Sequence, residues 1–261
     1  MAVGEVIRRL LIPVSLGLLL AGCASSSGGG GSASSYNWGW YIFNPFQAKG
    51  LSNLQFLIGG MWWTVLVSVC AIVLSVIVGA LVAVAGLSKR KSLNRINRVY
   101  VEVFRAIPLL VLMLWVFYGL PVIIGLQLGV FATGVLSLAI SDSAFEAEVF
   151  RAGIQSVPKG QVEAAKSLGL GWSLTMRLVV IPQAIKVILP ALGNQFVYVL
   201  KMSSLISVIG LQELTRRANE LNVSEYRPLE TYTLLVLEYL VLILFVSYMV
   251  RRMERRMATS Q

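Results

Sequence analysis

The sequence has no histidine and only two cysteines, Cys23 and Cys70. Two cysteines cannot form a disulfide framework, and without histidine the usual ligand sets for zinc and haem are missing, so no metal site and no bound cofactor are expected. Charged residues are also scarce, at 13% of the 261 residues, whereas 57% are hydrophobic. Soluble domains carry about a quarter charged residues, so the composition predicts an integral membrane protein.

The net charge of +10 does not indicate a protein that binds nucleic acid. The basic residues fall in short clusters between long apolar runs, a pattern typical of topology signals rather than of a basic surface. The sequence has no glycine-rich phosphate loop of the G-x-x-x-x-G-K-[ST] type, and no nucleophile and base or metal pair indicates catalysis. The chain is therefore not expected to be an enzyme.

The N-terminal 23 residues have the proportions of a signal peptide. Two arginines precede an uncharged stretch, 10–22, that is shorter than the ~20 residues needed for a spanning helix. The stretch ends in Leu-Ala-Gly-Cys, so residues 1–23 are either a lipoprotein-type signal, with Cys23 as the acylated new N-terminus, or an uncleaved anchor. Residues 24–53, which are rich in serine and glycine at their start, are expected to form a periplasmic linker.

Long uncharged runs predict an all-α fold with five core membrane spans. Loops rich in lysine and arginine alternate with loops in which glutamates offset the basic residues. The positive-inside rule then places the start of the core outside and its C-terminus in the cytoplasm. A transmembrane domain over 54–257, with an inner loop over 151–182, follows. The predicted spans are 54–87, 99–119, 128–149, 190–211 and 231–250.

The inner loop contains a helix-forming run from Glu163 to Leu168 that stops at Gly169. A short surface helix is predicted, because glycine commonly ends helices. Such a helix fits the groove of a cytoplasmic partner, where Glu163 can accept charge-assisted hydrogen bonds and Gly169 allows a sharp turn. The composition by itself is also typical of a solvated amphipathic loop helix.

The spacing from this run to a later proline is more specific. Glu163, Ala164 and Ala165, followed by Gly169 and by Pro182 at the end of Val-Val-Ile-Pro, resemble the EAA motif of ABC importer permeases. Three further strings resemble the polar amino acid branch of that family, the histidine, glutamine and arginine type. These strings are Arg105–Leu110, Ala147–Ser156 and Gly193–Gly210.

The resemblance implies the five-span fold of type I ABC importer permeases, in a bacterial inner membrane, and a translocation pathway for polar amino acids. It implies that the EAA residues couple this chain to a cytoplasmic ABC ATPase dimer, which binds the ATP and magnesium. It also implies a second permease chain, identical or different, and a periplasmic or lipid-anchored amino acid binding protein. Membrane lipids surround the chain, and nucleic acid is not a partner.

Ionisable side chains inside the predicted spans mark a candidate substrate pathway, because such groups are costly in a bilayer. Lys201 lies near the middle of the fourth predicted span and can meet a substrate carboxylate. Asp142 and Glu146 are four residues apart on one helix face, where they can receive an ammonium or guanidinium group, or instead neutralise Lys201. Ser203 and Ser204 add hydroxyls beside Lys201.

Three other charged residues invite a structural interpretation. Glu238, in the last span, is interpreted as a contact for helix packing or dimerisation. Arg105 and Glu148 lie nearer the inner face and are expected to stabilise loops there, with gating as the alternative.

A secondary transporter or a channel is the alternative function. Its buried charges would relay protons or ions without an ATPase. This hypothesis leaves the spacing from Glu163 to Pro182 unexplained, and five spans give no inverted repeat of obvious length.

Overall fold

The computed structural model describes residues 36–88 and 90–258. The chain divides into two units, 1–38 and 39–261. Every helix in the described residues belongs to the second unit. The predicted signal or anchor, with Cys23, lies outside the described residues.

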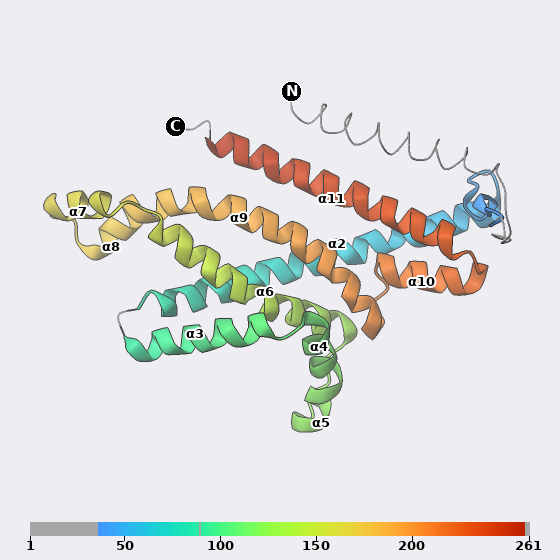
Figure 1. The fold of residues 1–261 in the computed structure, drawn as a ribbon, viewed down its shortest axis with the longest axis horizontal. Helices are drawn as coiled ribbons and strands as arrows, with labels where there is room; N and C mark the ends of the chain where they lie inside the picture. Colours follow the sequence, from blue (N-terminus) through green and yellow to red (C-terminus); the bar gives the residue numbers. More distant parts are fainter. Residues whose placement is uncertain (1–35, 89, 259–261) are drawn as a thin grey trace, which may run out of the picture. The chain divides into compact units, whose positions relative to one another are not determined.

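The second unit is helical throughout, and the described residues contain no strand (Figure 1). Two short elements, η1 and η4, are 3-10 helices, and two others, η2 and η3, are π-helical. The elements are η1 Trp40–Phe43, α2 Ala48–Gly86, α3 Lys91–Ala106, α4 Leu109–Leu114, η2 Trp115–Gly119, α5 Leu120–Ile124, α6 Val130–Gln155, α7 Lys159–Ser167, α8 Trp172–Thr175, η3 Met176–Val180, α9 Ile181–Met202, η4 Ser203–Ile209, α10 Leu214–Glu225 and α11 Pro228–Ala258.

Helix α2 is the centre of the fold. It begins at Ala48, before the predicted start of the first span, and its 39 residues extend about 58 Å at 1.5 Å per residue. One face carries small residues at intervals of three or four, which lets the backbones of α6 and, near its start, α10 approach closely. The buried small residues of this face are Gly60, Thr64, Ser68, Ala71, Ser75, Gly79 and Ala83.

Four stretches of the described residues are long and apolar enough to cross a membrane, and a bent pair of helices adds a fifth if it is one span. The second predicted span, 99–119, is not a single straight helix, because the chain bends by 98° between α3 and α4. Pro108 disfavours helical backbone in the residue before it, and Ile107 is extended with a ψ of 123°. In Figure 1, α4 and α5 turn away from α3.

The predicted inner loop is largely helical. Helix α7 forms over the EAA run, as predicted, and Gly169 follows it in the left-handed region at a φ of +79°. From Trp172 the chain continues through η3 into α9, so the fourth spanning stretch runs over Trp172–Ile209 and begins well before the predicted 190. Helix α9 begins at Ile181, with Pro182 in its first turn, where proline is well tolerated. Pro190, at which the sequence predicted the start of the span, therefore lies inside the helix.

Helix α10 packs against the first half of α2. The contact is tight at Gly60, where an added Cβ would meet the Leu214 backbone nitrogen at 2.8 Å. Nearby, Arg217 donates to the Phe56 carbonyl across 2.6 Å and lies over the Phe56 ring. Helix α10 is therefore fixed to the rest of the bundle by backbone contact as well as by side chains.

Candidate functional site

Helix α7 carries the predicted coupling residues at the surface. Glu163 and Ala164 are exposed, whereas Ala165 is buried. The apolar side chains of Leu168 and Trp172, which follow the helix, are 82% and 76% exposed. Exposed apolar side chains beside an exposed carboxylate are typical of a surface that contacts another protein.

The turn after α7 is held by backbone hydrogen bonds. The Gly169 amide donates to the Lys166 carbonyl at 2.9 Å, and the Leu170 amide donates to the Ala165 carbonyl at 3.1 Å. The positive φ of Gly169 is a conformation that side chains disfavour. Pro182, the last residue of the motif, is exposed at the start of α9.

Asp142 lies where three helices meet. Its carboxylate accepts a hydrogen bond from the Ser75 hydroxyl of α2 at 2.7 Å and another from the Gln195 amide of α9. Asp142 itself belongs to α6 and is 3% exposed. Sequence reasoning missed both partners, although the position of Gln195 in a spanning helix was a signal that could have found it.

Glu146 lies one turn along α6 and is completely buried. Both of its carboxylate oxygens lack a hydrogen-bond partner among the described residues. The side chain packs on Gly79 of α2 so closely that a Cβ added there would meet the Glu146 Cβ at 2.6 Å. The Glu146 side chain therefore lies in the contact between α2 and α6.

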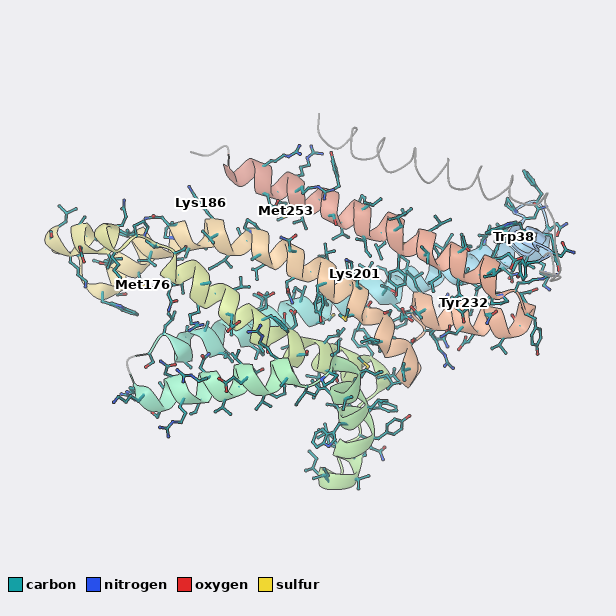
Figure 2. All side chains as sticks on the ribbon, in the orientation of Figure 1. Trp38, Met176, Lys186, Lys201, Tyr232 and Met253 are labelled. Atoms are coloured by element: carbon teal, nitrogen blue, oxygen red, sulfur yellow. The ribbon has the colours of Figure 1, made fainter. Side chains whose placement is uncertain are left out.

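Lys201 lies apart from these two carboxylates. It is exposed and lines a cavity of about 490 Å³ between α9 and α11, and Figure 2 labels it near the end of α9. Neither Asp142 nor Glu146 forms an ion pair with any described residue, so the structure does not bring them to Lys201 as the alternative of mutual neutralisation requires. Other residues lining the cavity include Asn194, Tyr198, Ser247, Arg251 and Glu254.

The two serines after Lys201 turn their hydroxyls back to the helix. Ser203 is buried and donates to the Leu200 carbonyl at 2.7 Å, and Ser204 donates to the Lys201 carbonyl at 2.8 Å. Both hydroxyl donors are thus used within the backbone of α9.

The remaining charged residues of the spans differ in their contacts. Arg105 of α3 forms an ion pair with Glu148 of α6 and lies 4.9 Å from the centre of the Phe145 ring, so it joins two helices. Glu238 of α11 is 8% exposed, and neither of its carboxylate oxygens has a hydrogen-bond partner among the described residues.

Glu213 is a buried acid that the sequence analysis did not identify. It begins α10, where its side chain accepts from the Arg216 amide at 2.7 Å and from the Tyr239 hydroxyl at 2.9 Å. Burial raises the pKa of Glu213 to about 7, although these hydrogen bonds act in the opposite direction. An acidic residue directly before a helix-forming run is typical of an N-cap, and this pattern could have identified Glu213 in the sequence.

Comparison with known proteins decides the family. The family model described as "Binding-protein-dependent transport system inner membrane component" matches residues 71–259. The chain belongs to this family. It is 40% identical over 208 residues to a probable glutamine ABC transporter permease protein of Bacillus subtilis, GlnM, covering 80% of this chain and 96% of the relative.

Two further similarities support the same family. The arginine transport system permease protein ArtQ of Bacillus subtilis is 31% identical over 210 residues, covering 80% of this chain and 96% of the relative. A chain of a crystal structure, "an amino acid ABC transporter with histidines", aligns with a TM-score of 0.75 and 41% identity, covering 79% of this chain and 96% of that chain.

The family assignment confirms the predicted class of protein. The chain is a multi-pass inner membrane protein and a permease subunit of an ABC importer, and it matches membrane subunits rather than ATPases. The alternative of a secondary transporter or channel is not supported, because family, relatives and solved structure all belong to ABC systems.

Proposed function

We propose that this permease subunit imports polar amino acids through a pathway in its helical bundle. The α7 helix carries this proposal, because it presents Glu163 and Ala164 of the EAA motif at the surface, whereas Ala165 packs inward. The named relatives act on glutamine and arginine, which supports a polar amino acid as substrate.

In this proposal α7 docks on a cytoplasmic ABC ATPase that binds the ATP and magnesium, while the permease itself binds no cofactor. The exposed Leu168 and Trp172 supply apolar contact, and Glu163 accepts hydrogen bonds from the ATPase. Closure of the ATPases moves α7 and α9 together, because only a four-residue turn, 168–171, and the short α8 and η3 segments connect them. The bundle then alternates between inward-open and outward-open states.

The proposed topology has five spans. The second span is the bent pair formed by α3 and the segment 109–124, which contains α4, η2 and α5. The start of the core lies outside and the C-terminus in the cytoplasm. Two clusters of basic residues support this orientation, since positive charge collects in cytoplasmic segments. They are Arg90, Lys91, Arg95 and Arg98 at the start of α3, and Arg251, Arg252 and Arg255 at the end of α11.

The proposed importer contains further subunits. A second permease chain, identical or different, completes the pathway, and a periplasmic or lipid-anchored binding protein delivers the amino acid. On the substrate side, Lys201 is a candidate to bind the carboxylate of the amino acid, since it is exposed and lines a cavity of about 490 Å³. Four further residues are proposed to shape the pathway through helix packing, and none of them lines that cavity. They are Asp142, Glu146, Ser203 and Ser204.

A pair of glycine variants tests the coupling proposal. Gly169→Val strains a residue with a φ of +79°, whereas Gly171→Val, at a φ of −63° with open space around it, is a matched control. We expect the Gly169 variant to insert in the membrane but to lose the co-purifying ATPase, and the Gly171 variant to retain it. Equal retention by both variants would contradict docking through α7.

Uptake measurements test the pathway. Lys201→Met is expected to weaken the apparent affinity for the amino acid, because the cavity loses its ammonium group. Asp142→Asn is expected to lower the amount of folded protein more than the affinity, because Asp142 joins three helices. Normal substrate affinity in both variants would exclude both residues from the pathway.

A further inference from the structure

The cavity between α9 and α11 carries charges that the protein does not pair. The charged residues that line it are Lys201 of α9 and Arg251 and Glu254 of α11. None of the three forms an ion pair with another described residue. Two positive charges and one negative charge leave the lining with a net charge of +1. The uncharged lining residues are Asn194, Val197, Tyr198, Ser247 and Val250.

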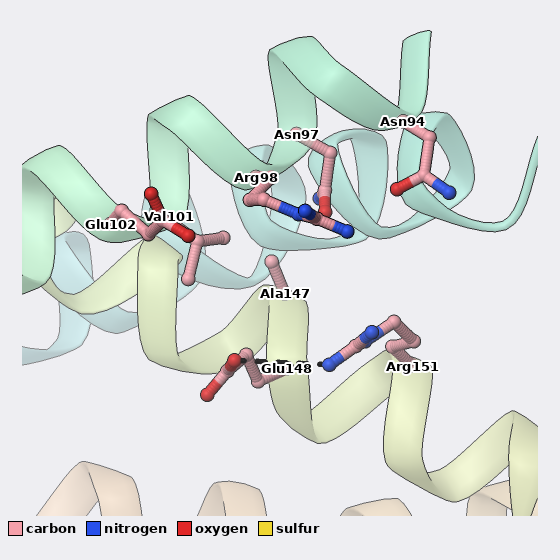
Figure 3. Close-up of a pocket in the computed structure, with 8 residues that line it drawn as sticks. All are labelled: Asn94, Asn97, Arg98, Val101, Glu102, Ala147, Glu148 and Arg151. Atoms are coloured by element: carbon pink, nitrogen blue, oxygen red, sulfur yellow. Dashed lines mark ion pairs between the residues drawn. The ribbon is translucent and has the colours of Figure 1, made fainter. Parts of the chain in front are cut away.

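A smaller cleft, between α3 and α6, shows the opposite case. Its volume is about 200 Å³, and Figure 3 shows an ion pair between Glu148 and Arg151 at its edge. Its other two charged residues are Arg98 and Glu102, so positive and negative charges balance within the protein. The cavity between α9 and α11 is both unbalanced and larger. Its volume of about 490 Å³ lies within the roughly 300–1,000 Å³ that is typical of sites for small molecules.

The register of the two helices sets the order of the three charges. Helices α9 and α11 run side by side in opposite directions (Figure 1), and a Cβ added at Gly193 would meet the Val250 side chain. Gly193 is therefore level with Val250. At 1.5 Å per residue, Lys201 lies about 12 Å from this level toward the end of α9, and Glu254 lies about 6 Å from it in the opposite direction.

Side-chain direction brings the charges closer together than their backbones. Side chains of a helix lean toward the N-terminus of that helix. Lys201 therefore leans toward the start of α9, whereas Arg251 and Glu254 lean toward the start of α11, so the two groups converge. Arg251 and Glu254 are also neighbours, because residues three apart share one face of a helix. The order along the cavity is Lys201, Arg251 and Glu254.

An acidic amino acid matches this order of charges. Its ammonium group and its α-carboxylate share one carbon atom, as Glu254 and Arg251 share one face of α11. Its second carboxylate lies a few bonds away, in the direction of Lys201. Such a molecule carries one positive and two negative charges, so it pairs every charge of the lining. A basic amino acid would bring a second positive charge for which the lining has no acceptor, and an unpaired charge is costly to bury.

We propose that the α9–α11 cavity binds an acidic amino acid, with Glu254 on the ammonium group, Arg251 on the α-carboxylate and Lys201 on the side-chain carboxylate. The inference rests on the proposed function, because the ligand is the amino acid that the permease carries. Uncharged polar groups of Asn194 and Ser247 supply further hydrogen bonds along the cavity.

Equilibrium binding tests the proposal without a binding protein. The full chain is purified in mild detergent with the ATPase that co-purifies, and labelled L-glutamate is displaced by unlabelled glutamate, glutamine or arginine. We expect glutamate to bind at least about tenfold more tightly than the other two, because glutamine loses one charged contact and arginine adds an unpaired charge. Lys201→Met should abolish the preference for glutamate over glutamine, whereas Arg251→Gln and Glu254→Gln should weaken the binding of both about tenfold.

Arg252→Gln is the matched control, because it removes the same charge from the next position of α11, outside this cavity. It should bind glutamate as the wild type does. No binding of glutamate, tighter binding of arginine, or an equal loss in the Arg251 and Arg252 variants would each overturn the proposal. ATPase co-purification and uptake, measured on the same preparations, report separately on the proposed function, which holds if the chain imports another polar amino acid.

Discussion

The Ser75 hydroxyl of α2 donates to the Asp142 carboxylate of α6 across 2.7 Å, where the two helices pack closely. The same carboxylate accepts from Gln195 of α9, so one acidic side chain holds donors from two other helices. A buried acceptor that loses one of its donors is costly, which makes this junction sensitive to small substitutions.

The Ser75 hydroxyl can be removed with a close control. Ser75→Ala is expected to lower the free energy of unfolding by about 1–3 kcal/mol, because Asp142 keeps only one donor. Ser224→Ala removes a hydroxyl that donates only to the Leu221 carbonyl and should change stability by no more than about 0.5 kcal/mol. Unfolding of both variants in detergent compares them, and equal shifts would argue against the Asp142 junction.

Substitution of Glu146 is expected to raise the free energy of unfolding, unlike substitution of Ser75. Glu146→Met is expected to stabilise the bundle by about 1–3 kcal/mol, because it replaces a fully buried carboxyl group without a partner by an apolar side chain of similar length. Glu148→Met, which breaks the ion pair with Arg105, should not stabilise. A gain in stability with lost uptake would place Glu146 in the transport cycle, whereas a loss of stability would contradict the absence of a partner.

The contact between α2 and α10 predicts a glycine effect. Gly60→Ala is expected to cost about 1–3 kcal/mol, because its Cβ would approach backbone atoms of Glu213 and Leu214 within 3 Å. Gly160→Ala, in a helix with nothing within 4 Å, should be neutral or stabilising by up to about 1 kcal/mol. Thermal unfolding of the two variants checks the difference, and a neutral Gly60 variant would mean that α10 moves away freely.

Glu213 predicts a dependence of stability on pH. Its pKa rises from 4.5 to about 7 in the folded chain, so its contribution to stability is fully present below pH 4.5 and is lost as the pH rises through about 7. The change amounts to at most roughly 3 kcal/mol. Unfolding midpoints from pH 4 to 8 should fall less steeply in Glu213→Gln than in wild type. Identical slopes in the two proteins would refute the assignment.

The sequence predicted the family, the helical class and the surface helix over the EAA run, because those depend on composition, periodicity and local spacing. It also contained the signal for the bend, since Pro108 restricts Ile107, but the long uncharged run hid it. The sequence marks Gln195 as a polar residue in a spanning helix, but it does not pair Gln195 or Ser75 with Asp142. A 3.6-residue period says that Asp142 and Glu146 share a face of α6, yet it does not say which helix lies opposite that face.

The same limit explains Lys201. Its depth in a span was the basis for pairing it with Asp142 and Glu146, but depth along a helix leaves the direction around the axis open. The structure turns Lys201 toward α11 and turns Gln195, six residues earlier, toward α6. Rotation about the helix axis, fixed only by packing, therefore separates the two groups.

Helix α2 is long enough to contact α10 near one end and α3 near the other. Near one end its Phe56 carbonyl holds Arg217, and near the other its Val82 carbonyl holds Asn97. No proline interrupts the 39 residues, and α2 is one continuous α-helix from Ala48 to Gly86. A tilt of one degree about one end of a rod about 58 Å long displaces the other end by about 1 Å. A small angular change where α10 is attached thus becomes an atomic-scale shift at the other end, where Val82 of α2 accepts the hydrogen bond of Asn97 in α3.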